Sequence, residues 1–345
     1  MWNYDSMTMK KKNFLKIIFL AVLIVGTVLI IMQQRNTPYQ HDTGFVFGTE
    51  YHITYQSSED LQPEIDKALA QVDTALSPFN KKSVITQVNN NRPVKLSEMF
   101  TEVFSKAESI SRETDGAFDI TVAPLVNAWG FGFKSGVHPS RHVVDSLRQF
   151  VGYTKVALVD GRIVKKDPRL MLDCSGIAKG YGVDVVAKLL RDKGIENFMV
   201  EIGGEIVTSG ISEKRLPWKI GVTKPTDDPA QTNQELQTVL NVTDKAMATS
   251  GNYRNFYYKG GKKYAHTIDP KTGYPVQHNI LSSTVLAGDC ATADAYATAF
   301  MVTGLKGAQA ILRKHPELMV YFIYDDGKGH NQVWYSPSMK KAIAE

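Results

Sequence analysis

Apolar residues recur along the chain with two spacings, and each spacing predicts one kind of element. Alternating or short apolar runs predict strands, whereas apolar residues three and four positions apart predict helices. The strand pattern occurs at residues 45–55, 155–159, 169–172, 198–202, 216–222 and 281–286. The helical pattern occurs at residues 61–76, 97–114, 177–193, 292–303 and 306–314. Because the two kinds are interspersed irregularly, an α+β fold is favoured over a regular doubly wound sheet.

A continuous apolar run near the N-terminus indicates membrane targeting. It extends from Ile17 to Met32, follows a cluster of lysines at positions 10, 11, 12 and 16, and would span roughly 24 Å as a helix. Positive charge before the run predicts a cytoplasmic N-terminus and an exported body. Neither a small-residue cleavage site nor a cysteine for lipid attachment follows the run, so an uncleaved anchor is favoured over a cleaved signal peptide.

These patterns predict four consecutive parts of the chain. They are a basic N-terminus at 1–16, a transmembrane signal anchor at 17–32, a polar linker at 33–44 and one catalytic domain at 45–345. Within the domain, a stretch rich in Thr, Asp, Pro and Gln at 223–237 predicts a surface loop.

Composition narrows the class of protein. With 345 residues, 43% of them hydrophobic and 22% charged, the chain is globular rather than disordered. Its formal net charge of +5 is small and comes partly from the N-terminal lysines, so nucleic-acid binding is not expected. Only two cysteines, Cys174 and Cys290, are present, which excludes a disulfide framework; both are expected to behave as small buried hydrophobes.

An alanine-rich segment at 289–304 places Asp294 and Thr298 one turn apart on one helix face. The small neighbours let a ligand approach, and a carboxylate and a hydroxyl together suit a hard cation, Mg²⁺ before Zn²⁺. The alternative from these residues alone is an ordinary capped core helix with Asp294 facing water.

A second candidate is the segment from Leu170 to Asp184, which is predicted to pass from a strand through a small-residue turn into a helix. That geometry directs free backbone N–H groups at an anion. Lys179 would add positive charge beside a diphosphate, and Asp173 could bind a ligand hydroxyl or ring nitrogen. A tight turn with a solvated lysine remains the alternative.

Four shorter segments complete the candidate site. Residues 115–124 combine Phe118 with Asp119, which suits a pocket for a flat heteroaromatic ring, although a plain hairpin is the alternative. Gly203 and Gly204 follow a strand and permit close backbone approach. Residues 247–253 offer hydroxyl and backbone donors in a loop. His266 ends a strand and is the readiest proton-transfer group, although a lone histidine is more often structural.

Taken together and in order, these segments resemble the ApbE family of FAD:protein FMN transferases over about residues 45–335. The resemblance rests on Gly-Ala-Phe-Asp at 116–119, Leu-Asp-Cys-Ser-Gly-Ile-Ala-Lys-Gly at 172–180, Gly-Gly at 203–204, Ala-Thr-Ser-Gly at 248–251, His-Thr-Ile-Asp-Pro-Lys-Thr-Gly at 266–273 and Ala-Asp-Ala-Tyr-Ala-Thr at 293–298.

The resemblance implies an ApbE-type domain that binds FAD and Mg²⁺, transfers FMN to a Ser or Thr hydroxyl of an acceptor protein and releases AMP. It implies Asp294 and Thr298 as metal ligands, with carbonyls near Gly176 and Ala297, and His266 as the catalytic histidine. The FAD contacts it implies are Ala117, Phe118, Asp119, Asp173, Lys179, Ser250 and Ile268. Phe47 and Phe79 stand where relatives often have Met and Tyr, so stacking is kept but a hydroxyl at position 79 is lost.

The resemblance also implies a partner and a location. The acceptor would carry an Asp-x-x-Ser/Thr-Gly-Ala-Ser/Thr segment, typically on a membrane redox subunit; this chain has no such segment, so self-modification is not expected. The enzyme would sit in the bacterial inner membrane with its catalytic domain facing the periplasm or exterior. Two alternatives remain open: an FAD pyrophosphatase that yields FMN and AMP, and a non-catalytic exported FAD-binding protein.

Overall fold

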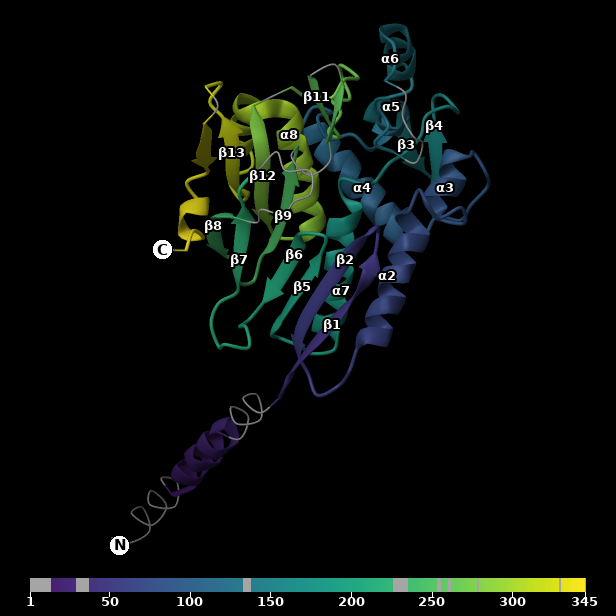
Figure 1. The fold of residues 1–345 in the computed structure, drawn as a ribbon. Coiled ribbons are helices and arrows are strands. Elements are labelled where there is room, and N and C mark those ends of the chain that lie inside the picture. Colours follow the sequence, from purple (N-terminus) through teal and green to yellow (C-terminus); the bar gives the residue numbers. More distant parts are fainter. Residues whose placement is uncertain are drawn as a thin grey trace, which may run out of the picture.

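The computed structural model describes residues 14–28, 37–132, 138–225, 235–252, 256–259, 262–277, 279–328 and 330–344. Eight of the described strands form one antiparallel sheet in the order β1-β2-β5-β6-β9-β12-β13-β14 (Figure 1). They are β1 (Tyr39–Val46), β2 (Thr49–Gln56), β5 (Phe198–Ile202), β6 (Glu205–Ser209), β9 (Ala246–Gly251), β12 (Ile280–Ala287), β13 (Met319–Asp325) and β14 (Asn331–Tyr335).

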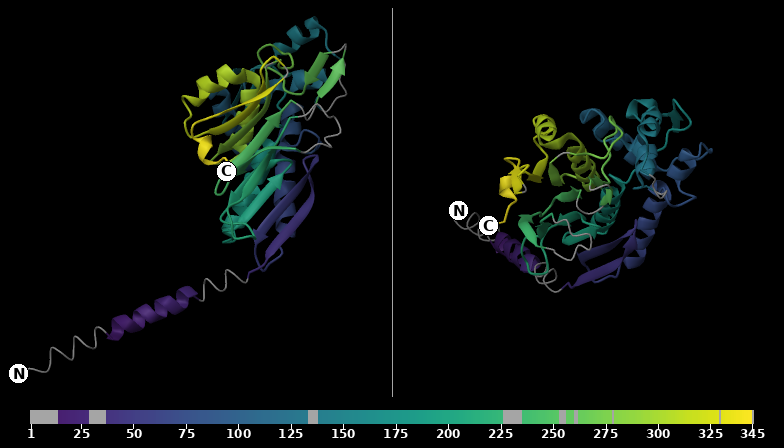
Figure 2. Two further views of the ribbon diagram at one scale, coloured as in Figure 1. Left: turned by 60° about the vertical axis from the view of Figure 1, so that its left-hand side comes forward. Right: turned by 45° about the horizontal axis from the view of Figure 1, so that its top comes forward.

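Helices pack on one face of this sheet. Helix α7 contacts β5 and β6, α8 contacts β9 and β12, and α2 and α4 pack outside α7 and α8 respectively (Figures 1 and 2). Their apolar faces form the two largest hydrophobic clusters with the sheet. The helices of the folded body are α2 (Gln62–Leu76), α3 (Val84–Asn89), α4 (Glu98–Glu113), α5 (Ala123–Trp129), α6 (Arg141–Arg148), α7 (Ala178–Asp192) and α8 (Cys290–Leu312), with short 3₁₀ turns η1 (Ile120–Val122), η2 (Tyr153–Lys155) and η3 (Met339–Lys341).

Three hairpins flank the sheet: β3 (Val156–Val159) with β4 (Arg162–Lys165), β7 (Lys219–Thr223) with β8 (Leu236–Asn241), and β10 (Phe256–Lys259) with β11 (Lys262–Ala265). The β7–β8 hairpin and η3 cover the sheet face away from α7 and α8, where Leu240 and Met339 are fully buried. The predicted α+β class is therefore confirmed, and the predicted loop at 223–237 ends in a strand, with residues 226–234 outside the described part.

The strand predicted at 45–55 is wrong in one respect, because the alternation hides a turn. Phe47 and Gly48 take positive φ values of 52° and 79°, so the chain reverses between β1 and β2 instead of continuing. Strand β1 also begins at Tyr39, inside the stretch predicted as a linker, and Asp42 within it is buried. The polar residues 39–44 are thus paired with β2 in the sheet.

The strand predicted at 169–172 is not formed. This segment pairs with no strand of the described chain. Leu170 N donates to Asp167 O in a turn at 3.1 Å, and the Asn89 side chain accepts from Leu172 N at 2.7 Å and donates to Leu172 O at 2.8 Å. The short apolar run reflects burial of Leu170 and Leu172 rather than membership of a sheet.

The two helices predicted at 292–303 and 306–314 meet end to end in α8. Gly304 interrupts the helical geometry with φ 67° and ψ 177°, a conformation that glycine tolerates. The predicted break between the helices is therefore confirmed. Residues 14–28 form a separate helix, and the rest of the predicted anchor lies outside the described residues. Within the described chain, no helix combines the length and apolarity required to cross a bilayer.

Candidate active site

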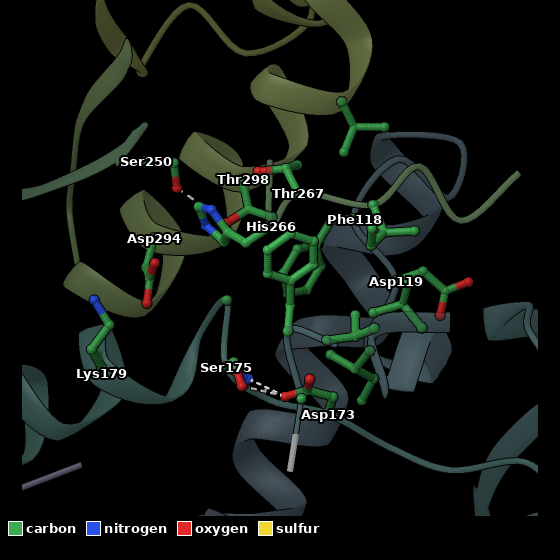
Figure 3. Close-up of a pocket in the computed structure, with 18 of the residues that line it drawn as sticks. Phe118, Asp119, Asp173, Ser175, Lys179, Ser250, His266, Thr267, Asp294 and Thr298 are labelled. Carbon is green, nitrogen blue, oxygen red and sulfur yellow. Dashed lines mark hydrogen bonds between the residues drawn. The ribbon is translucent and has the colours of Figure 1, made fainter. Parts of the chain in front are cut away.

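A cavity of about 580 Å³ opens where α7, α8, β9 and the β5–β6 turn meet. It receives residues from all six segments that carry the family resemblance (Figure 3). Its volume lies within the range typical of small-molecule sites. We describe it as two walls: the α8 wall, formed by α8, β9 and the start of α7, and the loop wall, formed by residues 117–120, 131–132 and 266–268.

Asp294 and Thr298 of α8 both line the cavity. Asp289 begins α8 by accepting a hydrogen bond from Thr292 N at 2.8 Å. The alanines that follow, Ala293, Ala295 and Ala297, are fully buried, so α8 sits close to the sheet and still presents one polar face. Helix α8 is therefore both a capped core helix and one side of the polar site. Asp294 is only 4% exposed, so it does not face water.

Burial dominates the electrostatics of Asp294. Desolvation and the nearby Glu205 carboxylate raise its pKa to about 7, although Lys179 and the Gly180 N–H oppose the shift. The Gly180 N–H, in the first turn of α7, donates to Asp294 Oδ2 at 3.2 Å. A cation at this carboxylate would offset the cost of its buried charge.

The turn before α7 forms the floor of the cavity. Asp173 accepts hydrogen bonds from Ser175 N at 2.8 Å and from the Ser175 hydroxyl, which bends the chain into α7. Gly176 lies against Thr298, since a Cβ at this glycine would come within 3.2 Å of Thr298 Oγ1. Lys179 lines the cavity and pairs with Glu205 at 2.5 Å. The alternative of a solvated lysine is therefore not found at this position.

Ser250 lies on β9, and the loop predicted for this segment is wrong. β9 runs between β6 and β12 in the sheet, and Ser250 pairs there with Ser283. Its backbone is thus engaged by the sheet, and its hydroxyl faces the cavity 3.3 Å from Thr298 Oγ1 (Figure 3).

Ala117, Phe118 and Asp119 begin the loop wall. The chain turns here at Asp115 and Gly116, with φ values of 51° and 73°, and enters η1 instead of the alternative hairpin. The Asp119 carboxylate accepts from Thr121 N and Tyr153 N at 2.8 Å each. Burial raises the pKa of Asp119 despite these bonds. Its carboxylate therefore fixes this loop, and Figure 3 shows it directed away from the centre of the cavity.

His266 and Ile268 complete the loop wall. His266 directly follows β11, as predicted, and its ring lies edge-on to Phe131 with 6.5 Å between ring centroids. The turn beyond it is closed by Asp269 N donating to Tyr274 O at 2.9 Å and Gly273 N donating to Asp269 O at 2.8 Å.

Three predicted site residues do not line the cavity. Phe47 packs on α7, where a Cβ at Gly182 would come within 2.5 Å of its ring, and its neighbours Gly48 and Thr49 line the cavity instead. Gly204 turns its N–H to Glu201 at 2.6 Å, while Gly203 does line the cavity. Ala297 is fully buried inside the helix layer. Phe79 lies at the rim and is 71% exposed.

Among the lining residues that the sequence analysis did not assign to the site are Glu205, Thr267 and Phe131. Glu205 is only 3% exposed, and its place immediately after the double glycine was an available signal. Thr267 is buried and donates to Asn252 Oδ1 at 3.0 Å. Both cysteines are free and buried, and burial raises both thiol pKa values, in line with the predicted packing role.

Comparisons with known proteins agree with this geometry. The model of the ApbE family matches residues 47–322. A protein of Vibrio cholerae named FAD:protein FMN transferase is 35% identical over 333 residues, covering 93% of this chain and 98% of its own. One of the same name from Escherichia coli K12 is 34% identical over 300 residues, covering 84% of each chain.

Solved structures give the same result. The flavin transferase ApbE from Vibrio cholerae superposes with a TM-score of 0.80 at 35% identity, covering 88% of this chain and 99% of its own. The apo form of the flavinyl transferase ApbE from Pseudomonas stutzeri gives 0.78 at 28% identity, covering 89% and 97%. This chain therefore belongs to the ApbE family.

Proposed function

We propose that this protein transfers FMN from FAD to a Ser or Thr hydroxyl of an acceptor protein and releases AMP. The observation that carries the proposal is the convergence of six sequence segments on one cavity, with a buried carboxylate, a hydroxyl and a lysine on one wall and an aromatic side chain and a histidine on the other. The names of the relatives, FAD:protein FMN transferase, support the choice of substrate.

The oxygen donors of the α8 wall fit Mg²⁺. Asp294 is a buried carboxylate whose pKa is raised, Thr298 adds a hydroxyl, and the backbone at Gly176 lies against Thr298. In the described chain, no group of three or more His, Cys, Asp or Glu side chains could hold a metal ion. Backbone carbonyls near Gly176 and Ala297 and the diphosphate of FAD would therefore supply the other ligands of Mg²⁺. When bound there, Mg²⁺ would neutralise charge on the diphosphate oxygens.

The remaining residues have distinct tasks. Phe118 stacks with the flat isoalloxazine ring, while Lys179 and the first N–H groups of α7 face the diphosphate. The acceptor oxygen attacks the phosphorus of the FMN half; the bond from that phosphorus to the bridging oxygen breaks, and AMP leaves. His266 takes the proton of the acceptor hydroxyl as general base. These assignments require FAD to lie with its diphosphate against the α8 wall.

We also propose that the apolar run at 17–32 anchors the protein in the inner membrane and that the catalytic domain faces the exterior. The lysines that precede the run support this orientation. Membrane fractionation followed by protease treatment of intact spheroplasts tests it: a domain that is digested supports the orientation, and a protected domain contradicts it.

The transfer itself is tested on an acceptor protein carrying the Asp-x-x-Ser/Thr-Gly-Ala-Ser/Thr segment. The full-length enzyme is incubated with FAD, Mg²⁺ and this acceptor, and the intact acceptor mass is measured. We expect a gain of one FMN that disappears when both Ser/Thr positions of the segment are changed to Ala. An unchanged mass for the acceptor, with FAD consumed, would contradict transfer.

A further inference from the structure

Two segments far apart in sequence form a strongly basic surface beside the cavity. Residues 81–95 contain Lys81, Lys82, Arg92 and Lys95 and no carboxylate, and residues 162–169 contain Arg162, Lys165, Lys166, Arg169 and one carboxylate, Asp167. That carboxylate is engaged by Arg169 at 2.8 Å. Between the two segments runs a groove of about 720 Å³, which we call the basic groove.

The basic groove combines apolar and cationic side chains. Its apolar lining includes Val88, Val94, Leu96 and Ile163, and its charged lining is Arg92, Lys95, Arg162 and Lys165, with no acidic residue among the lining side chains. Arg92, Lys95 and Arg162 are exposed. An apolar floor with a cationic rim fits a polypeptide segment that carries both apolar and acidic side chains better than it fits a free phosphate.

Specific hydrogen bonds hold the two sides of the groove together. Lys165 Nζ donates to Val88 O at 2.7 Å and to Asn91 Oδ1 at 3.1 Å, and Asn91 Nδ2 donates to Pro168 O at 2.9 Å. Both of these partners of Lys165 are neutral, and burial lowers its pKa to about 8. The shape of the groove is thus fixed by the fold, and an anionic partner would stabilise the charged form of this lysine.

The groove lies next to the mouth of the cavity. Pro78 and Phe79 line the cavity just before Lys81 and Lys82 in the chain. On the other side, the Asn89 side chain binds the backbone of Leu172, which precedes the cavity residue Asp173. A protein whose hydroxyl enters the cavity past Phe79 would therefore cover this surface.

The groove also lies far from the point where the chain enters the folded body. Figure 1 shows α3 and β4 at the opposite end of the body from the start of β1. If the residues before β1 lead to a membrane, the groove faces away from it. This placement favours a protein partner over a lipid surface.

We propose that the basic groove docks an acidic segment of the acceptor protein, adjacent to the hydroxyl that receives FMN. This inference rests on the proposed transferase function. Docking of this kind raises kcat/KM for the acceptor through association and is weakened by salt.

The test compares two acceptor peptides with full-length enzyme. Both peptides carry the same target segment, with a glycine-serine spacer and a tail at each end. The tails of the first peptide consist of glutamate and leucine. In the second peptide, glutamine replaces every glutamate of the tails. At low salt we expect about a tenfold higher kcat/KM for the glutamate peptide, a ratio that falls toward one at high salt. A ratio of one at low salt would overturn the proposal.

Two triple variants locate the effect. Arg92→Gln with Lys95→Gln and Arg162→Gln should abolish the preference and leave kcat/KM for the glutamine peptide unchanged. The matched control, Lys219→Gln with Lys340→Gln and Lys341→Gln, removes three exposed cations near β7, β8 and the C-terminus, on the opposite side of the body (Figure 1). We expect it to keep the preference; an equal loss in both variants would mean that only net charge matters.

A binding measurement separates this proposal from the transferase itself. Fluorescence anisotropy of the glutamate peptide, with its target hydroxyl replaced by Ala, needs no catalysis; we expect the first triple variant to bind it about tenfold more weakly than the second. If neither active peptide gains FMN but this difference holds, the transferase is wrong and the groove stands. If the first variant loses binding to phosphatidylglycerol vesicles but not to the peptide, the surface faces lipid and the proposal fails.

Discussion

The two walls of the cavity differ in how they are built. Asp294, Thr298 and Ser250 of the α8 wall lie on a buried helix and an interior strand of the main sheet. Phe118, Asp119 and His266 of the loop wall lie on connections between elements, held by side-chain to backbone bonds such as Asp119 to Tyr153 N. The proposed metal ligand Asp294 thus lies on a regular element, whereas Phe118 and His266 lie on connections. The buried carboxylate of Asp119 also lies on a connection, where it fixes its own loop.

This difference follows from the cost of burying charge. A buried carboxylate such as Asp294 needs partners that are held in place. If those partners moved away, the charge would stay in an apolar surrounding without a hydrogen bond to offset its desolvation. An aromatic ring or an imidazole is less costly to bury, so connections can carry it and adjust to the substrate. We therefore expect changes in the α8 wall to remove chemistry outright and changes in the loop wall to reduce rate or affinity separately.

The largest expected effect is that of Asp294→Asn. The variant keeps the shape of the side chain and removes the negative charge that would hold the cation, so FMN transfer in Mg²⁺ should fall by about a thousandfold or more. Transfer is measured by intact mass of the acceptor. Asp289→Asn, at the cap of the same helix and outside the cavity, serves as control, and activity retained by Asp294→Asn would refute the metal assignment.

His266→Ala should slow transfer by about a hundredfold, because the acceptor hydroxyl loses its general base. FAD affinity, measured by equilibrium fluorescence titration, should change little. His142→Ala on the exposed side of α6 should change neither quantity. A loss of FAD binding comparable to the loss of rate would instead make His266 a contact of the ligand.

Phe118→Leu should weaken FAD binding by about tenfold, since the ring stacking is lost while most of the apolar area remains. The rate at saturating FAD should stay close to that of the unchanged protein. Phe100→Leu alters another buried phenylalanine, on α4 in the core; it should lower thermal stability without changing FAD affinity. Equal affinities for the two variants would place the flavin ring elsewhere.

The smallest expected effect concerns the junction of α7 and α8. Asp184 accepts from Cys290 N and Ala291 N at 2.8 Å each, and burial raises its pKa to about 7. Because the folded state holds the proton above the ordinary pKa near 4, this group loses stabilisation as pH rises from about 4 to 7, by about 1.4 kcal/mol per unit.

Asp184→Asn should reduce the pH dependence of the unfolding free energy over that window, as measured by urea titration. The contribution of Asp294, whose pKa is also raised to about 7, remains. Asp192→Asn, an exposed carboxylate at the end of the same helix, should leave the dependence in place. A slope shared by the unchanged protein and Asp184→Asn would show that the titrating group lies elsewhere.

The sequence predicts contacts within one element better than contacts between elements. Helical spacing is local, so the pairing of Asp294 with Thr298 follows from residues one turn apart. The Lys179–Glu205 pair does not, because packing of α7 on β6 brings together residues 26 positions apart. The sequence does not predict the chain reversal at Phe47 either, because this residue lies inside an alternating pattern that predicts one continuous strand.

The fold was predictable in class but not in topology. Helix α7 has a clear helical period. Strands β12 and β13 are buried on both faces over most of their length, and such runs do not separate a buried strand from a helix. The segment at 169–172 has the composition of a strand, yet the Asn89 side chain binds the backbone N–H and C=O of Leu172. Whether a side chain or a neighbouring strand binds such backbone groups depends on the tertiary structure.

The central claim, that both walls act together on FAD and an acceptor, is tested most directly by the ratio of AMP released to acceptor labelled. The account predicts one AMP per FMN bound to the acceptor, with no release when acceptor is omitted or EDTA is added. Release of AMP and free FMN at the same rate without acceptor would contradict it, because water would then be the true substrate.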